Sequence, residues 1–150
     1  FVIPEGKSMS DMSTFDNAEL LQQALSARRN AYAPYSHFQV GAALLTEELG
    51  IVTGVNIENA SYGATNCAER TAVFKAVSEG ASHFKGIAIA GGMEGGSIEE
   101  YAFPCGICRQ VLQEFCGEDF LIIVAKSIDD YREYRLKELL PFGFGGESIK

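Results

Sequence analysis

The sequence between residues 86 and 125 reads GIAIAGGMEGGSIEEYAFPCGICRQVLQEFCGEDFLIIVA, and this stretch decides the fold class. Its first five residues are typical of a short buried strand, and residues 93–104 are typical of a long loop. A helix is predicted from about residue 105, with Gly117 as its stop signal. Residues 120–125 are continuously apolar, as in a strand covered on both faces. Because a helix that links two strands implies parallel pairing with a right-handed connection, this stretch predicts an α/β fold.

The segments on the N-terminal side extend this pattern. Asp16 and Glu19 resemble an N-cap and its N3 partner, and the apolar residues that follow have the spacing of a helix over residues 17–31. Alternating apolar residues from Phe38 predict a strand, which forms a hairpin with the next one. The other expected elements are a turn at 47–50, a strand at 51–57, a loop at 58–66, a helix at 67–80 and a short final segment at 136–140. The resulting order is β–β–α–β–α–β.

Length and composition indicate one globular domain with a small ligand. The chain has 150 residues, 47% of them hydrophobic and 21% charged. Residues 1–15 show no periodicity and are interpreted as a flexible or artificial extension, which leaves residues 16–150 as the domain. No apolar run approaches the ~20 residues of a membrane span. The formal net charge of -8, without a basic run longer than Arg28-Arg29, disfavours a polynucleotide partner.

The cysteines Cys67, Cys105, Cys108 and Cys116 are the strongest chemical signal. A domain of this size needs no disulfides, and its first residues lack the features of a secretory signal, so we expect a reducing, cytoplasmic setting. Cys105 and Cys108 lie one helical turn apart on one face. If the strands before the two helices run parallel, Cys67 reaches the same edge of the sheet. Three thiolates at helix N-termini favour zinc.

The number of protein ligands separates a structural zinc from a catalytic one. Cys116 lies eight residues beyond Cys108, roughly 12 Å along the helix axis, and is interpreted as a buried apolar residue. His37 and His83 lie away from the predicted strand–helix junctions. We therefore expect three protein ligands and one open coordination position, which is typical of a catalytic zinc.

Glu69 stands two residues after Cys67. A carboxylate in the first turn of a helix interacts favourably with the helix dipole, and this is its ordinary interpretation. Beside a metal, a carboxylate can also take a proton from water and pass it to a substrate. The neighbouring expected ligand favours the second role.

Cys67-Ala68-Glu69, followed by Pro104-Cys105-Gly106-Ile107-Cys108, resembles the zinc-dependent nucleoside and nucleotide deaminase signature in its variant with three cysteines. The runs VNIENASYG at 55–63 and CGICRQ at 105–110 narrow the resemblance to the small homotetrameric cytidine deaminases, over about residues 20–144. The resemblance implies a three-layer α/β/α fold with a mixed sheet of about five strands and the zinc site at helix N-termini. It implies that residues 16–150 form a catalytic domain. The expected reaction is hydrolytic deamination of cytidine and 2′-deoxycytidine to uridine and 2′-deoxyuridine, with release of ammonia, in pyrimidine salvage.

The resemblance also assigns roles around the metal. It implies one zinc ion per subunit, held by Cys67, Cys105 and Cys108. Glu69 is then expected to carry a proton from the attacking water to N3 of the cytosine ring and to protonate the departing amine. Arg70 matches an arginine that donates hydrogen bonds to the ligand sulfurs and withdraws their excess charge. Outside this context Arg70 would be interpreted as a solvated helix residue.

Further positions match substrate-binding residues of the family. Asn56 and Glu58 match a ribose-binding pair, and alternate residues of an extended strand share a face. Either residue alone would be an ordinary polar strand end. Phe38 matches an aromatic residue that packs on the pyrimidine, although alternation alone makes it a core strand residue. Ala68 belongs to the same substrate-binding set.

Three more positions, Ala60, Tyr62 and Phe144, match groups that neighbouring subunits contribute. This implies a homotetramer with shared active sites. The expected partner is a small nucleoside, with no polynucleotide and no membrane.

Four other interpretations remain open. A blasticidin-type aminonucleoside deaminase shares the metal signature, but the run Asn56-Ile57-Glu58-Asn59-Ala60 favours a plain nucleoside. A polynucleotide deaminase is disfavoured by the acidic charge and short length. A non-catalytic structural zinc module is separated from an enzyme by metal analysis and by Glu69→Gln. A thioredoxin-like redox protein is the fourth alternative, but in such a protein Cys67 and the nearby Glu69 would have no role.

Overall fold

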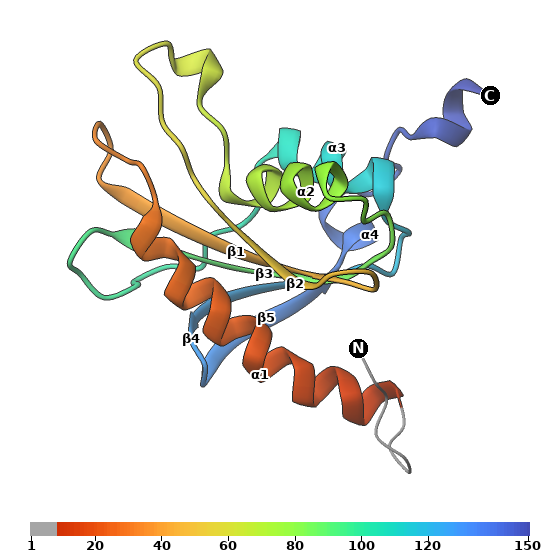
Figure 1. Cartoon of the computed structure of the whole chain (residues 1–150). Helices are drawn as coiled ribbons and strands as arrows, with labels where there is room; N and C mark the ends of the chain where they lie inside the picture. Colours follow the sequence, from red (N-terminus) through yellow and green to blue (C-terminus); the bar gives the residue numbers. More distant parts are fainter. Residues whose placement is uncertain (1–8) are drawn as a thin grey trace.

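The computed structural model describes residues 9–150, with side chains from residue 17 onward. In this part of the chain a five-stranded sheet of order β2-β1-β3-β4-β5 forms the middle layer (Figure 1). The strands are β1 (Phe38–Thr46), β2 (Gly50–Val55), β3 (Phe84–Met93), β4 (Leu121–Ser127) and β5 (Asp130–Arg135). The helices are α1 (Met9–Ala27), α2 (Ala68–Ser78), α3 (Gly106–Phe115) and α4 (Leu136–Leu139), with 3-10 turns at Arg28–Asn30, Tyr62–Ala64 and Gly146–Ile149.

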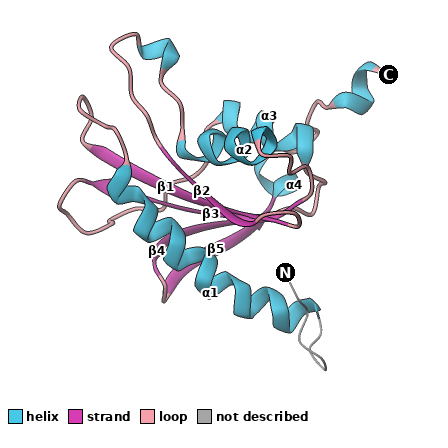
Figure 2. Cartoon of the chain, in the orientation of Figure 1, coloured by secondary structure: helices cyan, strands magenta, loops and turns pink. Residues whose placement is uncertain are grey.

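The helices cover both faces of the sheet. Figure 2 shows α1 along one face and α2, α3 and α4 along the other. The expected three-layer α/β/α fold with a mixed sheet of five strands is confirmed. None of the described helices combines the length and apolar character needed to cross a membrane.

Strand direction brings the two cysteine-bearing helices to one edge of the sheet. Among the five described strands, β3 and β4 are the parallel pair, whereas β1 is antiparallel to both β2 and β3. Since β1 reverses direction between them, β2 and β3 run the same way although they are not neighbours. Their carboxyl ends therefore lie at the same edge, and α2 and α3 follow those ends.

Period-two alternation divides the core between the two faces. Ala42 and Leu44 of β1 pack with α2 and α3, and Ala43 between them packs with α1. In β4, Ile122 and Val124 join the first cluster, and the strand's other apolar residues join the second. Because β4 serves both faces, all of its residues from 121 to 125 are buried.

Two glycines let the helices lie close to the sheet. A Cβ atom on Gly41 would lie 2.2 Å from the Ala24 carbonyl oxygen of α1. A Cβ atom on Gly54 would lie 2.4 Å from the Ala72 amide nitrogen of α2. Real Cβ atoms do not approach backbone atoms so closely, so β1 and β2 need glycine at these positions.

Some element boundaries differ from the expectations. Helix α1 begins at Met9 and not near residue 17, so Asp16 lies inside the helix and is not its N-cap. Residues 9–15 of the expected extension are thus helical, and residues 1–8 of it lie outside the described residues. Strand β2 ends at Val55, before the predicted 57, and β3 continues to Met93, beyond its predicted end at residue 90.

The edge strand β5 was not located in the sequence. Its residues, DYREYR, are almost all exposed and mostly charged, so they lack the apolar alternation of a half-buried strand. The strand forms because it pairs antiparallel with the buried β4 through a tight reversal after Ser127. Charged residues are common on such edges because they discourage pairing with another chain.

Candidate active site

The three predicted metal ligands come from two helix N-termini. Cys67 is the N-cap residue of α2, and Cys105 is the N-cap residue of α3. Cys108 lies in the first turn of α3 and is fully buried. Unpaired backbone N–H groups and the helix dipole make both positions favourable for thiolates.

The spacing of the sulfur atoms fits zinc. The Sγ atoms of Cys67 and Cys105 lie 3.8 Å apart, and all three Sγ atoms lie within 4.8 Å of one another. Two sulfurs of a tetrahedral site with Zn–S bonds of ~2.3 Å would be ~3.8 Å apart. Among the described residues no other histidine, cysteine or carboxylate joins this group. The donor set and its geometry therefore fit a zinc ion with one position left open.

Charge within the trio is unevenly shared. Hydrogen bonds, first from Cys108 and then from Arg70 and Cys105, lower the pKa of Cys67 to about 5. The hydrogen bond to Cys67, together with burial, raises the pKa of Cys108. The raised pKa of Cys108 opposes its ionisation, and a bound divalent cation would favour its thiolate form.

Arg70 contacts the trio at Cys67. Its Nη2 donates to the Cys67 sulfur over 3.3 Å. Its Nε is buried and has no hydrogen-bond partner among the described residues. A buried unpaired N–H is costly. Both observations indicate that the guanidinium is held against the sulfurs and not extended into solvent.

Glu69 lies beside the trio with its side chain almost fully buried, at 4% exposure. Burial raises the pKa of Glu69 to about 7, and a hydrogen bond from its own backbone amide opposes this shift. It lines a cavity of about 280 Å³ together with Cys67 and Cys105. A carboxyl group that titrates near neutrality can both accept and release a proton there.

The same cavity contains three of the four predicted substrate residues, Phe38, Asn56 and Ala68. The sequence interpretation missed other lining residues. Ala102 and Phe103 come from the loop before α3, and their position directly before Pro104 and the first ligand of α3 was the available signal. The ring of Phe103 packs against Tyr134 of β5, with ring centroids 5.4 Å apart.

Asn56 and Glu58 have different partners and line different cavities. The Asn56 amide oxygen accepts from the Val40 N–H at 2.9 Å, and its Nδ2 donates to the Phe38 carbonyl at 2.8 Å. Glu58 instead accepts from the hydroxyl of Ser36 at 2.5 Å and from nearby backbone N–H groups, which lowers its pKa. Glu58 lines a different cavity, beside Tyr35 and Tyr62. Its role toward ribose stays a prediction.

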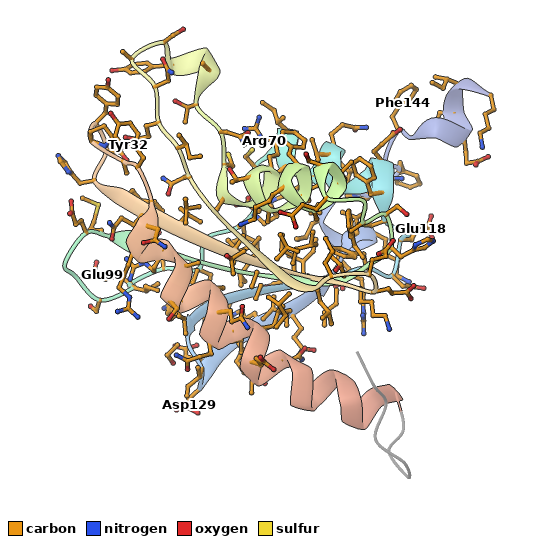
Figure 3. The ribbon with its side chains drawn as sticks, viewed as in Figure 1. Tyr32, Arg70, Glu99, Glu118, Asp129 and Phe144 are labelled. Carbon is orange, nitrogen blue, oxygen red and sulfur yellow. The ribbon has the colours of Figure 1, made fainter. Side chains whose placement is uncertain are left out.

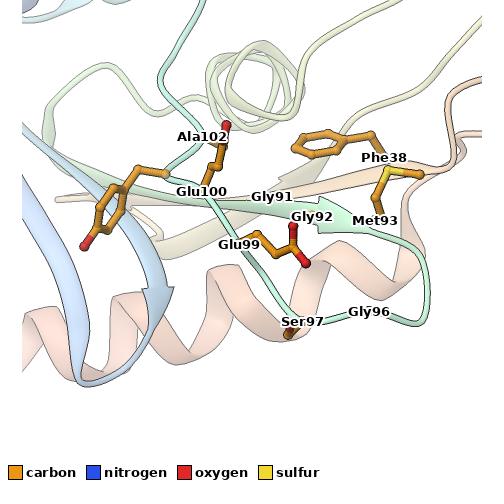
Figure 4. Close-up of a pocket in the computed structure, with 10 residues that line it drawn as sticks. Phe38, Gly91, Gly92, Met93, Gly96, Ser97, Glu99, Glu100 and Ala102 are labelled. Atoms are coloured by element: carbon orange, nitrogen blue, oxygen red, sulfur yellow. The ribbon is translucent and has the colours of Figure 1, made fainter.

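A larger cavity of about 420 Å³ adjoins the cysteine-lined one and shares Phe38 and Ala102 with it. Figure 4 shows Phe38 and Met93 on one side of it and Glu99 and Glu100 on the loop opposite. The ring of Phe38 therefore lies between the two cavities.

The residues matched to neighbouring subunits lie on the surface of this chain. Tyr62 is 79% exposed and Phe144 is 58% exposed, and Ala60 is exposed as well. Figure 3 shows Phe144 on the C-terminal segment, away from Arg70 of the same chain. None of the three lines the cysteine-containing cavity.

The remaining cysteine and the histidines lie outside the trio, as predicted. Cys116, the C-cap residue of α3, packs against the core, and burial raises its pKa to about 12. His37 faces Glu94 at 3.5 Å, and His83 faces Glu48 at 3.1 Å.

Fold and cysteine trio together define a zinc-binding α/β protein. Residues 15–124 match the family described as the cytidine and deoxycytidylate deaminase zinc-binding region, and the chain belongs to this family.

Individual relatives agree with this assignment. The chain is 46% identical over 134 residues to a cytidine deaminase of Halalkalibacterium halodurans, a match that covers 89% of this chain and 98% of the relative. It is 43% identical over 126 residues to a cytidine deaminase of Mycobacterium tuberculosis, over 84% of this chain and 87% of the relative. The crystal structure of cytidine deaminase from Burkholderia pseudomallei matches with a TM-score of 0.75 and 42% identity, over 84% of this chain and 97% of that chain.

Proposed function

We propose that this protein is a homotetrameric zinc-dependent cytidine deaminase. It would convert cytidine and 2′-deoxycytidine to uridine and 2′-deoxyuridine, releasing ammonia, in cytoplasmic pyrimidine salvage. The observation that carries the proposal is the position of Glu69, a buried carboxyl group next to the sulfur trio in a 280 Å³ cavity. Relatives that bear the name cytidine deaminase support the choice of substrate.

The reaction divides between the metal and the chain's own groups. When bound, zinc supplies a Lewis acid that makes water nucleophilic near neutral pH. Glu69 takes the proton of that water and passes it to N3 of the pyrimidine, so that C4 becomes open to attack. The same carboxylate then takes the proton of the new C4 hydroxyl group and delivers it to the departing amine. The C4–N4 bond breaks, and cytidine and water have become uridine and ammonia. Burial raises the pKa of Glu69, which helps this carboxylate to accept the proton.

Side chains around the cavity position the substrate. Phe38 offers a ring face to the pyrimidine from one wall. Asn56 fixes the end of β1 next to Phe38, and each of its amide atoms retains capacity for one more hydrogen bond, which a ribose hydroxyl could use. We propose that Ala60, Tyr62 and Phe144 complete the site of an adjacent subunit, since all three are exposed in the single chain.

The test is direct. Zinc-loaded protein is incubated with cytidine, 2′-deoxycytidine, deoxycytidylate and free cytosine, while cytosine absorbance and released ammonia are followed. We expect both nucleosides to be deaminated, with one ammonia released for each ring converted. Turnover of deoxycytidylate alone, or of none of the four, would overturn the proposal.

A further inference from the structure

The C-terminal segment is tied to α3 by the two residues that follow the last metal-ligand cysteine. Arg109 Nη1 donates to the carbonyl oxygen of Leu139 over 2.7 Å. Gln110 Nε2 donates to the carbonyl oxygen of Phe144 over 2.8 Å. The segment that begins at the end of α4 is therefore bonded at two points, five residues apart, to the helix that carries Cys108.

Arg109 also holds the loop on the other side of the metal site. Its Nε donates to the carbonyl oxygen of Pro104, also over 2.7 Å, and Pro104 directly precedes the ligand Cys105. Leu139 is the last residue of α4, so its carbonyl has no partner within that helix. The planar guanidinium of Arg109 thus links Pro104, just before the N-terminus of α3, to Leu139 at the C-terminus of α4. A lysine ammonium has no rigid fork with which to reproduce this arrangement.

The backbone beyond α4 lies directly on α3. A Cβ atom on Gly143 would lie 2.9 Å from Gln113 Oε1, and one on Gly145 would lie 3.3 Å from Gln113 Nε2. Between them and α4, Phe142 adopts a φ of 56° and its side chain is fully exposed. Figure 1 shows the chain passing from α4 beside α3 toward the C-terminus. Contacts with α3 therefore hold the backbone of residues 139–145, whereas the side chains of Phe142 and Phe144 are exposed.

We propose that Arg109 and Gln110 are positioning residues that couple the metal-holding turn of α3 to the C-terminal segment. Arg109 fixes Cys105 relative to α4, and Gln110 fixes Phe144 relative to the same helix. All of these contacts lie within one chain, so the coupling does not depend on the reaction. Its effect on substrate affinity rests on the proposed function, in which Phe144 serves a neighbouring site.

The first experiment measures the position of Phe144 without using activity. Because the chain has no tryptophan, Phe144→Trp introduces a single tryptophan, whose fluorescence can be excited apart from that of the tyrosines. In that background, Gln110→Glu keeps the size of the side chain but removes the N–H donor and places a carboxylate against a carbonyl. Glu114→Gln, on the same helix, is the matched control, because Glu114 is exposed and its side chain makes no hydrogen bond among the described residues.

We expect Gln110→Glu to lower the tryptophan anisotropy and to speed chymotryptic cleavage at Phe142 by about two- to tenfold, the change that corresponds to one lost hydrogen bond. Glu114→Gln should change neither quantity. Equal anisotropy and equal cleavage in Gln110→Glu and in the parent would overturn the proposal for Gln110, whether or not the protein deaminates cytidine.

The second experiment tests Arg109 with the zinc-loaded protein. Arg109→Lys is expected to release zinc to a chelator at least about tenfold faster, because the charge-assisted hydrogen bonds to Pro104, which precedes Cys105, and to Leu139 are weakened. Arg29→Lys, an exposed arginine near the end of α1, is the control and should release zinc at the parental rate. If the protein is active, Gln110→Glu should raise KM with little change in kcat. Parental zinc release in Arg109→Lys would overturn the proposal for Arg109.

Discussion

Arg70 Nη2 lies 3.3 Å from the Cys67 sulfur, and both residues belong to the N-terminal turn of α2. A side chain three residues along a helix shares a face with the N-cap, so the contact needs no long-range packing to form. It places a permanent positive charge against the Cys67 sulfur. We propose that this charge offsets the excess negative charge that three thiolates would give a bound zinc ion.

Removing this charge should weaken metal binding. We expect Arg70→Gln to lower zinc affinity or activity by about 10- to 100-fold, the usual effect of losing a group that supports a metal ligand. Competition with a chelator of known affinity measures the change. Lys75→Gln, an exposed residue on the same helix, removes the same charge and should leave zinc affinity unchanged. Equal affinity in both variants would show that Arg70 has no part in holding the metal.

Glu69→Gln should separate metal binding from proton transfer. Glutamine fills the same space but cannot accept the proton, so kcat is expected to fall by about 10²- to 10⁴-fold. Zinc content should remain at the parental level, because Glu69 is not a ligand. Full activity in this variant would exclude the carboxyl group as the proton carrier, and loss of zinc would show that it supports the metal instead.

Gly54 sets the distance between β2 and α2. We expect Gly54→Ala to destabilise the fold by about 1–3 kcal/mol, because a Cβ atom there would meet the α2 backbone at 2.4 Å. Since α2 carries Cys67 and Glu69, zinc affinity should fall as well. Denaturant unfolding and metal competition measure the two effects. Gly63→Ala is the control, because a Cβ atom on Gly63 would meet nothing within 4 Å.

Stability should depend on pH through Glu48. Its carboxylate accepts hydrogen bonds from Ser82 and His83, which lower the pKa of Glu48 from 4.5 to about 2. A lowered carboxyl pKa stabilises the fold above pH 4.5 and loses that effect as pH falls toward 2. The same contact raises the pKa of His83 above 6.5, so the contribution of His83 is complete below pH 6.5 and is lost as pH rises through the raised value.

The destabilisation caused by Glu48→Gln should therefore be largest between pH 4.5 and 6.5. Thermal unfolding of the variant and the parent across pH values checks this. Glu79→Gln makes the same charge change at an exposed side chain with no ion pair among the described residues. A difference that does not vary with pH, or that appears equally in Glu79→Gln, would contradict the prediction.

Shared active sites predict complementation between inactive chains. If Phe144 serves a neighbouring site, mixed oligomers of Glu69→Gln and Phe144→Ala contain some sites with both groups intact. Activity of the co-refolded mixture should then exceed the sum of the two variants refolded separately. Glu69→Gln mixed with Cys105→Ser should show no gain, because those residues line the cavity of a single chain. If light scattering showed that the active protein is a monomer, this prediction would have no basis.

The cysteine trio could be placed from the sequence because its geometry depends on local rules. The CxxC spacing fixes two sulfurs on one helix face, and a strand followed by a helix fixes which end of the sheet they reach. The strands before the two cysteine-bearing helices were predicted to run in the same direction. This is correct for β2 and β3, although β1 lies between them. The sequence placed Glu69 beside the expected ligand Cys67, but its burial was not predicted and is a finding of the folded chain.

Other features depend on contacts between distant residues and could not be predicted in this way. The charged edge strand β5 forms only because β4 is available to pair with it. Asn56 and Glu58 have strand spacing, but β2 ends at Val55, so their side chains reach different partners. The bonds from Arg109 to Pro104 and Leu139 join three segments whose proximity only the folded chain reveals.

The insertion of β1 between β2 and β3 also orders events during synthesis. Cys67 leaves the ribosome before Cys105, which follows 38 residues later. In the folded chain the cysteine pair of α3 meets Cys67 only because β1 lies between β2 and β3. We therefore expect full metal capture to require the assembled sheet. Acquisition of zinc would then mark polypeptides that have finished folding correctly.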